Sequence, residues 1–360
     1  MEQRPARGAF DREASAALKG IAILMMVFHH CFRVAKLYDG YAVSFFPFGK
    51  QQVMNAAFAC KICVSVFAFI SGYGLFLSYQ NYAGKGTATR WCTKRYVKTF
   101  SGYWFVWVLS AVILQIVDGR TGRILLRDGG YRGFLYGLID LNGLARLFDT
   151  PTLEFNWWYM SAAFVFILVT PLLWRARDEL ALVLAGSVVL LRVLNGGSGK
   201  DVFTGTCSVY AFLSPFLLGA IFARYELFER WAAIGSGKRW ARWYKLIVML
   251  WLLIACYKLY HNVPVEYFWE LRFGVFPVVF VMICVEYLLP VRWLRKALGF
   301  LGRYSMNMYM VHEFFRPFAY AGGHFAVDTA LLLGISLAVS VAIEAVKKVL
   351  KYDQWVNKLV

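Results

Sequence analysis

The sequence predicts an all-α integral membrane protein, with about ten transmembrane helices in one bundle and both termini in the cytoplasm. Of its 360 residues, 60% are hydrophobic and 17% are charged, whereas soluble domains have about 45–50% apolar and about 25% charged residues. Apolar stretches of nearly spanning length recur between charged connectors. Lys and Arg gather in alternate connectors. The composition therefore excludes a disordered, collagen-like or soluble nucleic-acid-binding protein.

Each predicted span is an apolar run bounded by charged or turn-forming residues. One further stretch, 134–149, is apolar but carries two Asp and one Arg, so we expect it to be interfacial or re-entrant rather than spanning. The ten predicted spans cover residues 17–37, 55–79, 99–118, 156–174, 181–194, 207–223, 244–260, 271–289, 298–318 and 329–346.

The distribution of basic residues predicts the orientation. If the N-terminus is cytoplasmic, the inside connectors carry 22 Lys and Arg and the outside connectors carry seven, of which five fall in segment 119–155. This bias supports ten spans with both ends inside, and therefore a multi-pass membrane protein. The formal net charge of +18 is then explained by topology and contact with membrane lipids, and no nucleic-acid partner is expected.

The domain organisation is simple: a single domain over residues 1–360, with its core at about 14–346.

Seven cysteines are present, most of them within apolar runs, where free Cys acts as a small hydrophobe. Cys60 and Cys63 form a lone C-x-x-C without a second pair, so no metal site is expected there.

The first candidate site lies in the segment LKGIAILMMVFHHCFR. Lys19 and His30 are eleven residues apart, which places them on one helix face about 16 Å apart. We interpret this as a cation near the cytoplasmic entry and an imidazole at mid-membrane, where it could act as a general base. The alternative is a snorkelling lysine and a histidine that bonds a neighbouring helix.

Two further segments concentrate polar side chains. The stretch 80–98 has five basic residues and no acid, among them Arg90, Arg95 and Lys98, which indicates either phosphate recognition or positive-inside anchoring. The segment LGRYSMNMYMVHEFF places polar side chains on one helix face, which suggests a cavity-facing stripe or interhelical hydrogen bonds. These side chains are Ser305, Tyr309, His312 and Arg316.

Two outer-surface features have simpler explanations. The run from Trp157 to Tyr159 opens the span at 156–174 and is typical of an aromatic belt at the membrane interface. Lys61, near the outer end of the second span, is expected to snorkel.

Taken together, these segments resemble the acyltransferase-3 family of integral membrane acyltransferases over residues 14–346. ALKGIAILMMVFHH is similar to the family's basic residue followed after ten residues by histidine, and VFAFISGYGLF to its second-span signature. RYVKTFSGYW resembles the basic entry to the third span, and LGRYSMNMYMVHEFF the closing pattern of glycine, serine, tyrosine and histidine.

The resemblance implies a multi-pass O-acyltransferase of the inner (plasma) membrane, with acyl-CoA, usually acetyl-CoA, as donor substrate and no tightly bound cofactor. The acceptor would be a hydroxyl of a cell-envelope glycan, lipid-linked sugar or small molecule. His30 matches the catalytic histidine, with Ser305, Tyr309 and His312 as further catalytic candidates. Four basic residues would bind the donor, namely Lys19, Arg90, Arg95 and Lys98.

Two positions depart from the family pattern. Ala163 stands where many members carry a glutamate, so the acidic partner of His30 is open, with Glu154 and Asp149 as candidates. Lys98 stands where arginine is usual. Two alternative functions stay open at this point: a ten-helix small-solute transporter, or an inactive family member acting as a sensor or scaffold.

Overall fold

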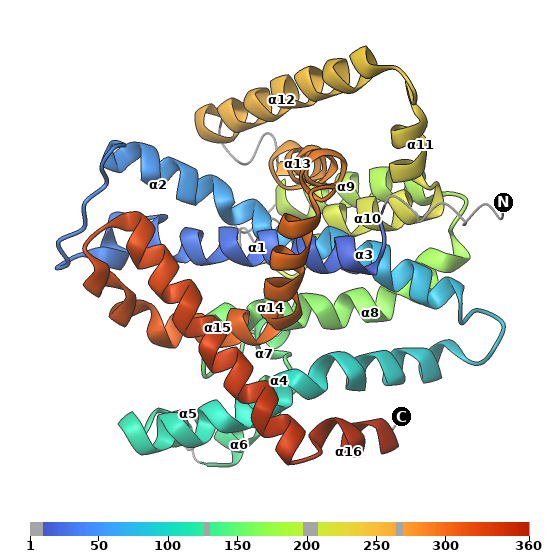
Figure 1. Ribbon diagram of the computed structural model, residues 1–360. Coiled ribbons are helices and arrows are strands. Elements are labelled where there is room, and N and C mark those ends of the chain that lie inside the picture. The colour runs from blue at the N-terminus through green and yellow to red at the C-terminus, as the bar shows by residue number, and fades with distance from the viewer. Residues whose placement is uncertain (1–9, 126–129, 197–207, 264–268, 360) are drawn as a thin grey trace.

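A computed structural model describes residues 10–125, 130–196, 208–263 and 269–359, and this part of the chain is almost entirely helical (Figure 1). Its only β feature is an isolated bridge between Ser44 and His324. The helices are α1 (Arg12–Phe32), α2 (Lys50–Ala59), α3 (Cys63–Gln80), α4 (Ala88–Asp118), α5 (Arg120–Leu125), α6 (Tyr131–Leu141), α7 (Ala145–Phe148), α8 (Tyr159–Arg175), α9 (Leu180–Gly196), α10 (Leu213–Arg224), α11 (Leu227–Ala233), α12 (Arg239–Asn262), α13 (Phe276–Ile283), α14 (Arg292–Ala319), α15 (Phe325–Val349) and α16 (Tyr352–Lys358).

Seven helical segments of the described chain are long and apolar enough to cross a membrane, which confirms an all-α membrane protein. They are Arg12–Phe32, Lys50–Gln80, Ala88–Asp118, Phe155–Arg175, Trp240–Asn262, Leu271–Leu288 and Phe325–Val349. The apolar helices α9 and α10 are shorter, and α14 is not among the seven because of its polar and basic residues. The count of ten and the cytoplasmic termini stay predictions.

Several predicted boundaries are wrong. The first helix ends at Phe32 rather than near residue 37, because a 3-10 turn at Ala35–Tyr38 follows it. The helix predicted at 99–118 begins at Ala88, where the Thr87 hydroxyl caps the N–H of Arg90. Residue 207, the first of the sixth predicted span, lies outside the described residues.

The stretch 134–149 falls in α6 and α7, which have 11 and four residues and are too short to span a bilayer.

Helix α1 lies at the centre of the bundle between α3 and α14. It crosses α14 very closely: a Cβ added to Gly20 would lie 2.0 Å from the Leu298 carbonyl oxygen, and one added to Gly302 would lie 1.7 Å from that of Ala16. Such contacts between backbones require glycine, as is common between membrane helices. The sequence thus positions the two polar helices against each other through two glycines.

Two polar contacts strengthen this arrangement at the beginning of α1. Asp11 caps the helix by accepting a hydrogen bond from the Ala14 N–H at 2.8 Å, and Arg295 at the start of α14 pairs with the same carboxylate. At the other end of α1, the connector that contains Ser44 pairs with the chain around Gly323 and Phe325, at 2.9 and 3.0 Å. The connector after α1 is therefore bonded to the start of α15.

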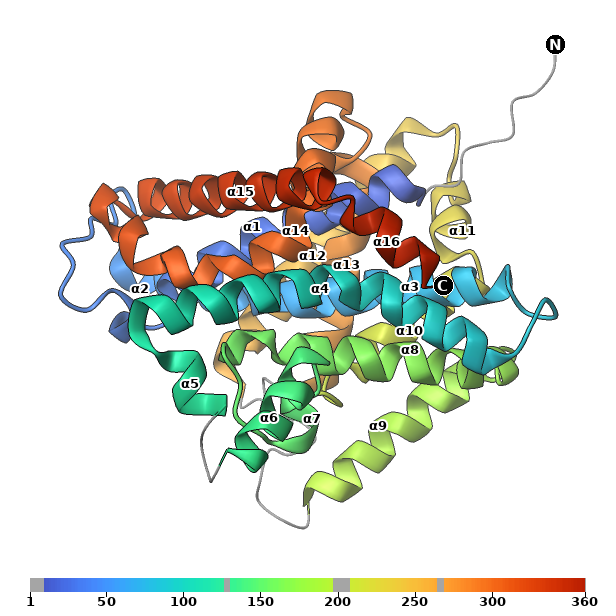
Figure 2. The same cartoon turned by 90° about the horizontal axis from the view of Figure 1, so that it is seen from below.

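The remaining helices flank this centre. Helix α12 lies at one side of the bundle and keeps a largely exposed apolar surface (Figure 1), as expected for a lipid-facing helix. On another side, α6 packs against α4 (Figure 2), where the Tyr103 hydroxyl donates to the Asp140 carbonyl at 2.6 Å. The short α6–α7 unit therefore lies against the bundle beside the helix that carries Arg95.

Candidate active site

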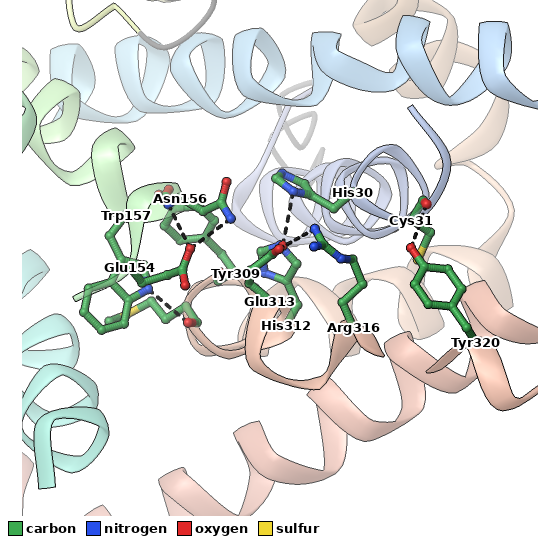
Figure 3. A network of polar contacts seen from close by, with 11 residues as sticks. His30, Cys31, Glu154, Asn156, Trp157, Tyr309, His312, Glu313, Arg316 and Tyr320 are labelled. Carbon is green, nitrogen blue, oxygen red and sulfur yellow. Dashed lines mark hydrogen bonds and ion pairs between the residues drawn. The ribbon is translucent and has the colours of Figure 1, made fainter. Parts of the chain in front are cut away.

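Two histidines and a carboxylate from two helices meet at the end of α1 (Figure 3). His30 lies in the last turn of α1, and His312 and Glu313 lie on α14. One oxygen of Glu313, Oε2, is 3.6 Å from His30 Nδ1 and 3.8 Å from His312 Nε2. His30 is 8% exposed, His312 is 0% exposed, and the side chain of Glu313 is 16% exposed. We call these three residues the histidine–glutamate cluster.

Hydrogen bonds orient two members of the cluster. Nδ1 of His312 lies 2.7 Å from the Tyr309 carbonyl oxygen; because a carbonyl only accepts, Nδ1 must carry the proton. On Glu313, Oε1 pairs with Arg316 one turn later. Among the described residues, Nε2 of His312, Nδ1 of His30 and Oε2 of Glu313 have no hydrogen-bond partner. Three unsatisfied polar atoms therefore face one another inside the protein.

A second polar chain reaches the same part of α14 from the connector before α8. The Glu154 carboxylate accepts hydrogen bonds from the N–H and the side-chain amide of Asn156, at 3.2 and 3.1 Å, and the Tyr309 hydroxyl donates to the Asn156 carbonyl. Burial, together with the charge of Glu313, raises the pKa of Glu154 despite those hydrogen bonds. Trp157 donates to the Met310 carbonyl at 3.0 Å.

A pair of cations lies toward the other end of α1. Lys19 and Arg95 are both half-buried and are near enough for the charge of Arg95 to act on Lys19. Neither forms an ion pair within the described part of the chain, and the Nε of Arg95 is buried without a hydrogen-bond partner there. Two unneutralised cations in a partly buried position favour an anion between them.

The structure separates the remaining predicted residues from these two groups. Arg90 and Lys98 are exposed on α4, so they do not share the half-buried position of Arg95. The Ser305 hydroxyl donates to the Gly302 carbonyl of its own helix at 2.9 Å. Because Ser305 precedes His312 by seven residues, it lies about 10 Å away along α14.

The acidic residue beside His30 is Glu313, not either of the two candidates named from the sequence. The side chain of Asp149 is 93% exposed and pairs with Arg146, and Glu154 bonds Asn156. The segment VHEFFR did carry a signal: a glutamate next to a histidine with an arginine three residues later, an i,i+3 ion pair in a helix. The sequence could not show that His30 faces it.

Three further expectations are wrong. The predicted first span, 17–37, places His30 within the helix, but α1 ends two residues after it. Trp157 and Trp158 are 3% and 7% exposed, so they pack inside the protein rather than forming an interfacial belt. Lys61 does not snorkel: it is 8% exposed, and its Nζ lies 5.3 Å from the centre of the Trp158 ring.

A cavity of about 100 Å³ adjoins the Trp157 side of the site. Aromatic rings and polar groups line it, including Tyr103, Trp157, Trp158, Asp140 and Arg146. The Asp140 carboxylate accepts hydrogen bonds from Trp107 at 2.9 Å and from the Leu153 N–H at 3.0 Å, yet burial raises its pKa. Such a mixed lining suits a ligand with both apolar faces and hydroxyl groups.

A comparison with protein-family models finds a match. The profile of a family described as "Acyltransferase domain" matches residues 13–345. No curated protein and no solved structure matches the chain.

Proposed function

The chain belongs to the acyltransferase-3 family, and we propose that it is a membrane O-acyltransferase whose catalytic base is His30. The donor would be acyl-CoA, with acetyl-CoA as the first candidate, and the acceptor a hydroxyl of a cell-envelope glycan, lipid-linked sugar or small molecule. The observation that supports this most directly is the placement of Glu313 beside His30, because a carboxylate is the group that orients a histidine base.

Lys19 and Arg95, which we call the basic pair, would bind the donor. Lys19 and Arg95 are partly buried cations without an ion-pair partner in the described chain, and the phosphates of CoA would supply the missing negative charge. Lys19 and His30 are on one helix about 16 Å apart. The extended arm of CoA, which connects its nucleotide phosphates to its thiol, can bridge such a separation. A donor bound at the basic pair could therefore present its thioester to His30.

The chemistry follows from the hydrogen-bonding pattern of an imidazole. When Nδ1–H of His30 donates to Glu313, Nε2 is left free to accept a proton. It would take the proton of the acceptor hydroxyl while that oxygen attacks the thioester carbonyl. The carbon–sulfur bond then breaks, and the protonated imidazole returns the proton to the CoA thiolate. The Nδ1–Oε2 separation of 3.6 Å would have to shorten when substrates bind, as is common in catalytic hydrogen bonds.

The acceptor would approach from the Trp157 side. The cavity beside this residue offers aromatic faces and the polar groups of Asp140 and Arg146, which suits a sugar better than an alkyl chain. Holding the hydroxyl and thioester together would make the reaction effectively unimolecular, worth up to about 7–11 kcal/mol.

The first experiment is a thermal-shift titration of the detergent-purified protein with acetyl-CoA. We expect saturable stabilisation, weakened in Lys19→Ala and Arg95→Ala because each removes one cation of the pair. Lys348→Ala, which removes an exposed cation from the end of α15, is the matched control and should titrate like the wild type. Absence of stabilisation by acetyl-CoA and by longer acyl-CoA, with every protein folded, would contradict the proposal and favour a transporter.

A second measurement separates an enzyme from a scaffold. His30→Ala should still bind acetyl-CoA, because the donor pair lies about 16 Å away, but it should lose acyl transfer to envelope acceptors in cells. Unchanged transfer in this variant would exclude His30 as the base.

A further inference from the structure

We infer that the histidine–glutamate cluster also forms a binding site for a divalent transition metal of the Zn²⁺ type. One atom from each of His30, His312 and Glu313 can serve as ligand, and these three atoms lie within 4.8 Å of one another. Two imidazole nitrogens with one carboxylate oxygen are a donor set that zinc accepts readily and that magnesium or calcium does not favour.

The unsatisfied atoms give the main physical argument. Nε2 of His312 presents a lone pair, since Nδ1 is bonded to the Tyr309 carbonyl, and a carboxylate oxygen also only accepts. These two acceptors face each other at 3.8 Å. Even if His30 donates its Nδ1 proton to Glu313, His312 Nε2 still lacks a donor in the described structure. A metal ion between the three atoms would satisfy all of them at once.

The geometry is close to that of a zinc site. Bonds of about 2.0–2.2 Å in a tetrahedral arrangement place ligand atoms about 3.3–3.6 Å apart. The two histidine–glutamate separations, 3.6 and 3.8 Å, need almost no adjustment. The two histidine ligand atoms lie within 4.8 Å of each other, so they need to approach by about 1.5 Å at most. A water molecule or the acceptor hydroxyl would complete the coordination.

The surroundings support the ligands as outer-shell groups usually do. The Tyr309 carbonyl fixes the ring of His312, and Arg316 holds the second oxygen of Glu313. The cluster is buried, but Glu313 is partly exposed, so an ion can reach it from that side.

Metal binding itself does not depend on the proposed function, but one consequence rests on it. A zinc ion bound to the lone pair of Nδ1 of His30 leaves the single proton of the neutral ring on Nε2, so Nε2 can no longer accept a proton from the acceptor hydroxyl. Zn²⁺ should therefore inhibit acyl transfer while leaving acetyl-CoA binding at Lys19 and Arg95 intact.

The test uses full-length protein purified without a polyhistidine tag and treated with EDTA, then titrated with Co²⁺ as a spectroscopic probe. We expect one equivalent to give visible absorption bands that one equivalent of Zn²⁺ abolishes. His312→Ala and Glu313→Gln should weaken binding by more than about tenfold, since loss of an outer-shell group alone costs about 10–100-fold. His312→Cys should retain binding and add a sulfur-to-cobalt charge-transfer band, which a change in folding alone cannot produce.

His29 provides the matched control. It neighbours His30 and is buried, but its Nδ1 lies 2.8 Å from the Ala57 carbonyl oxygen, so His29→Ala should bind Co²⁺ like the wild type. No binding by the wild type, or equal binding by His312→Ala and the wild type, would overturn the metal site. Acetyl-CoA stabilisation is measured on the same samples. If it is retained while Co²⁺ does not bind, only the metal site is overturned and the proposed function stands.

Discussion

The close crossing of α1 and α14 predicts that Gly302→Ala is disruptive. The added Cβ would lie 1.7 Å from the Ala16 carbonyl oxygen, and because that atom is backbone, no side-chain rotation relieves the clash. Reaching even 3.0 Å requires the helices to separate by about 1.3 Å. Overpacking of this kind costs about 1–3 kcal/mol. The same separation would move His30 away from Glu313. Nδ1 of His30 and Oε2 of Glu313 are already 3.6 Å apart.

The assay is a thermal melt of the detergent-purified variant, with a matched glycine as control. We expect the melting temperature of Gly302→Ala to fall by about 1–4 °C, because the unfolding entropy of a 360-residue chain is large. Gly299→Ala lies on the same helix, but its added Cβ has no atom within 4 Å, so its melting temperature should be unchanged or slightly raised, since alanine favours helix. Equal melting temperatures for the two variants would refute the argument from backbone contact.

Three other predictions concern single contacts. Trp157→Phe removes the hydrogen bond to the Met310 carbonyl and should cost about 0.5–1.5 kcal/mol in a thermal melt; an unaltered melt would show that the bond contributes nothing. Ser305→Ala should retain acyl transfer in cells, because the Ser305 hydroxyl donates a hydrogen bond to its own helix. Loss of transfer in this variant would show that Ser305 is a catalytic residue. Burial raises the pKa of Asp11, but hydrogen bonds from Ala14 and Arg295 outweigh it and hold that pKa below its ordinary value. The carboxylate therefore stabilises the fold above the ordinary aspartate pKa, and this contribution is lost as the pH falls through the lowered pKa. Melts of wild type and Asp11→Asn over acid pH should converge; parallel curves would argue against this linkage.

Much of the fold could be predicted because membrane helices are encoded locally. Length, hydropathy and charge at the ends of each apolar run are properties of neighbouring residues, and each of the ten predicted segments overlaps helical structure. Helix ends were harder to predict. The apolar run at 17–37 continues past Phe32, but the chain turns there because the following connector packs over the bundle, a contact made by residues around Gly323 that are distant in sequence.

The candidate site was predictable only in part. Helical spacing placed Lys19 and His30 on one face, and the cation of Arg95 does lie near Lys19. The carboxylate beside His30 was not found, because helical spacing relates residues within a helix and says nothing about which face of α14 meets α1. Two glycines, Gly20 and Gly302, decide that crossing, and through it they place Glu313 at 3.6 Å from His30.

The sequence by itself therefore determined the class of protein, the family and the residue types available for chemistry, since these depend on composition and local periodicity. Tertiary structure alone decided which polar groups are buried together. It buried Trp157 and Trp158 in the protein rather than at the lipid surface, left Arg90 and Lys98 exposed, and joined His312 and Glu313 to His30. The physical reason is that burial and helix pairing depend on contacts between distant segments, which no local pattern specifies.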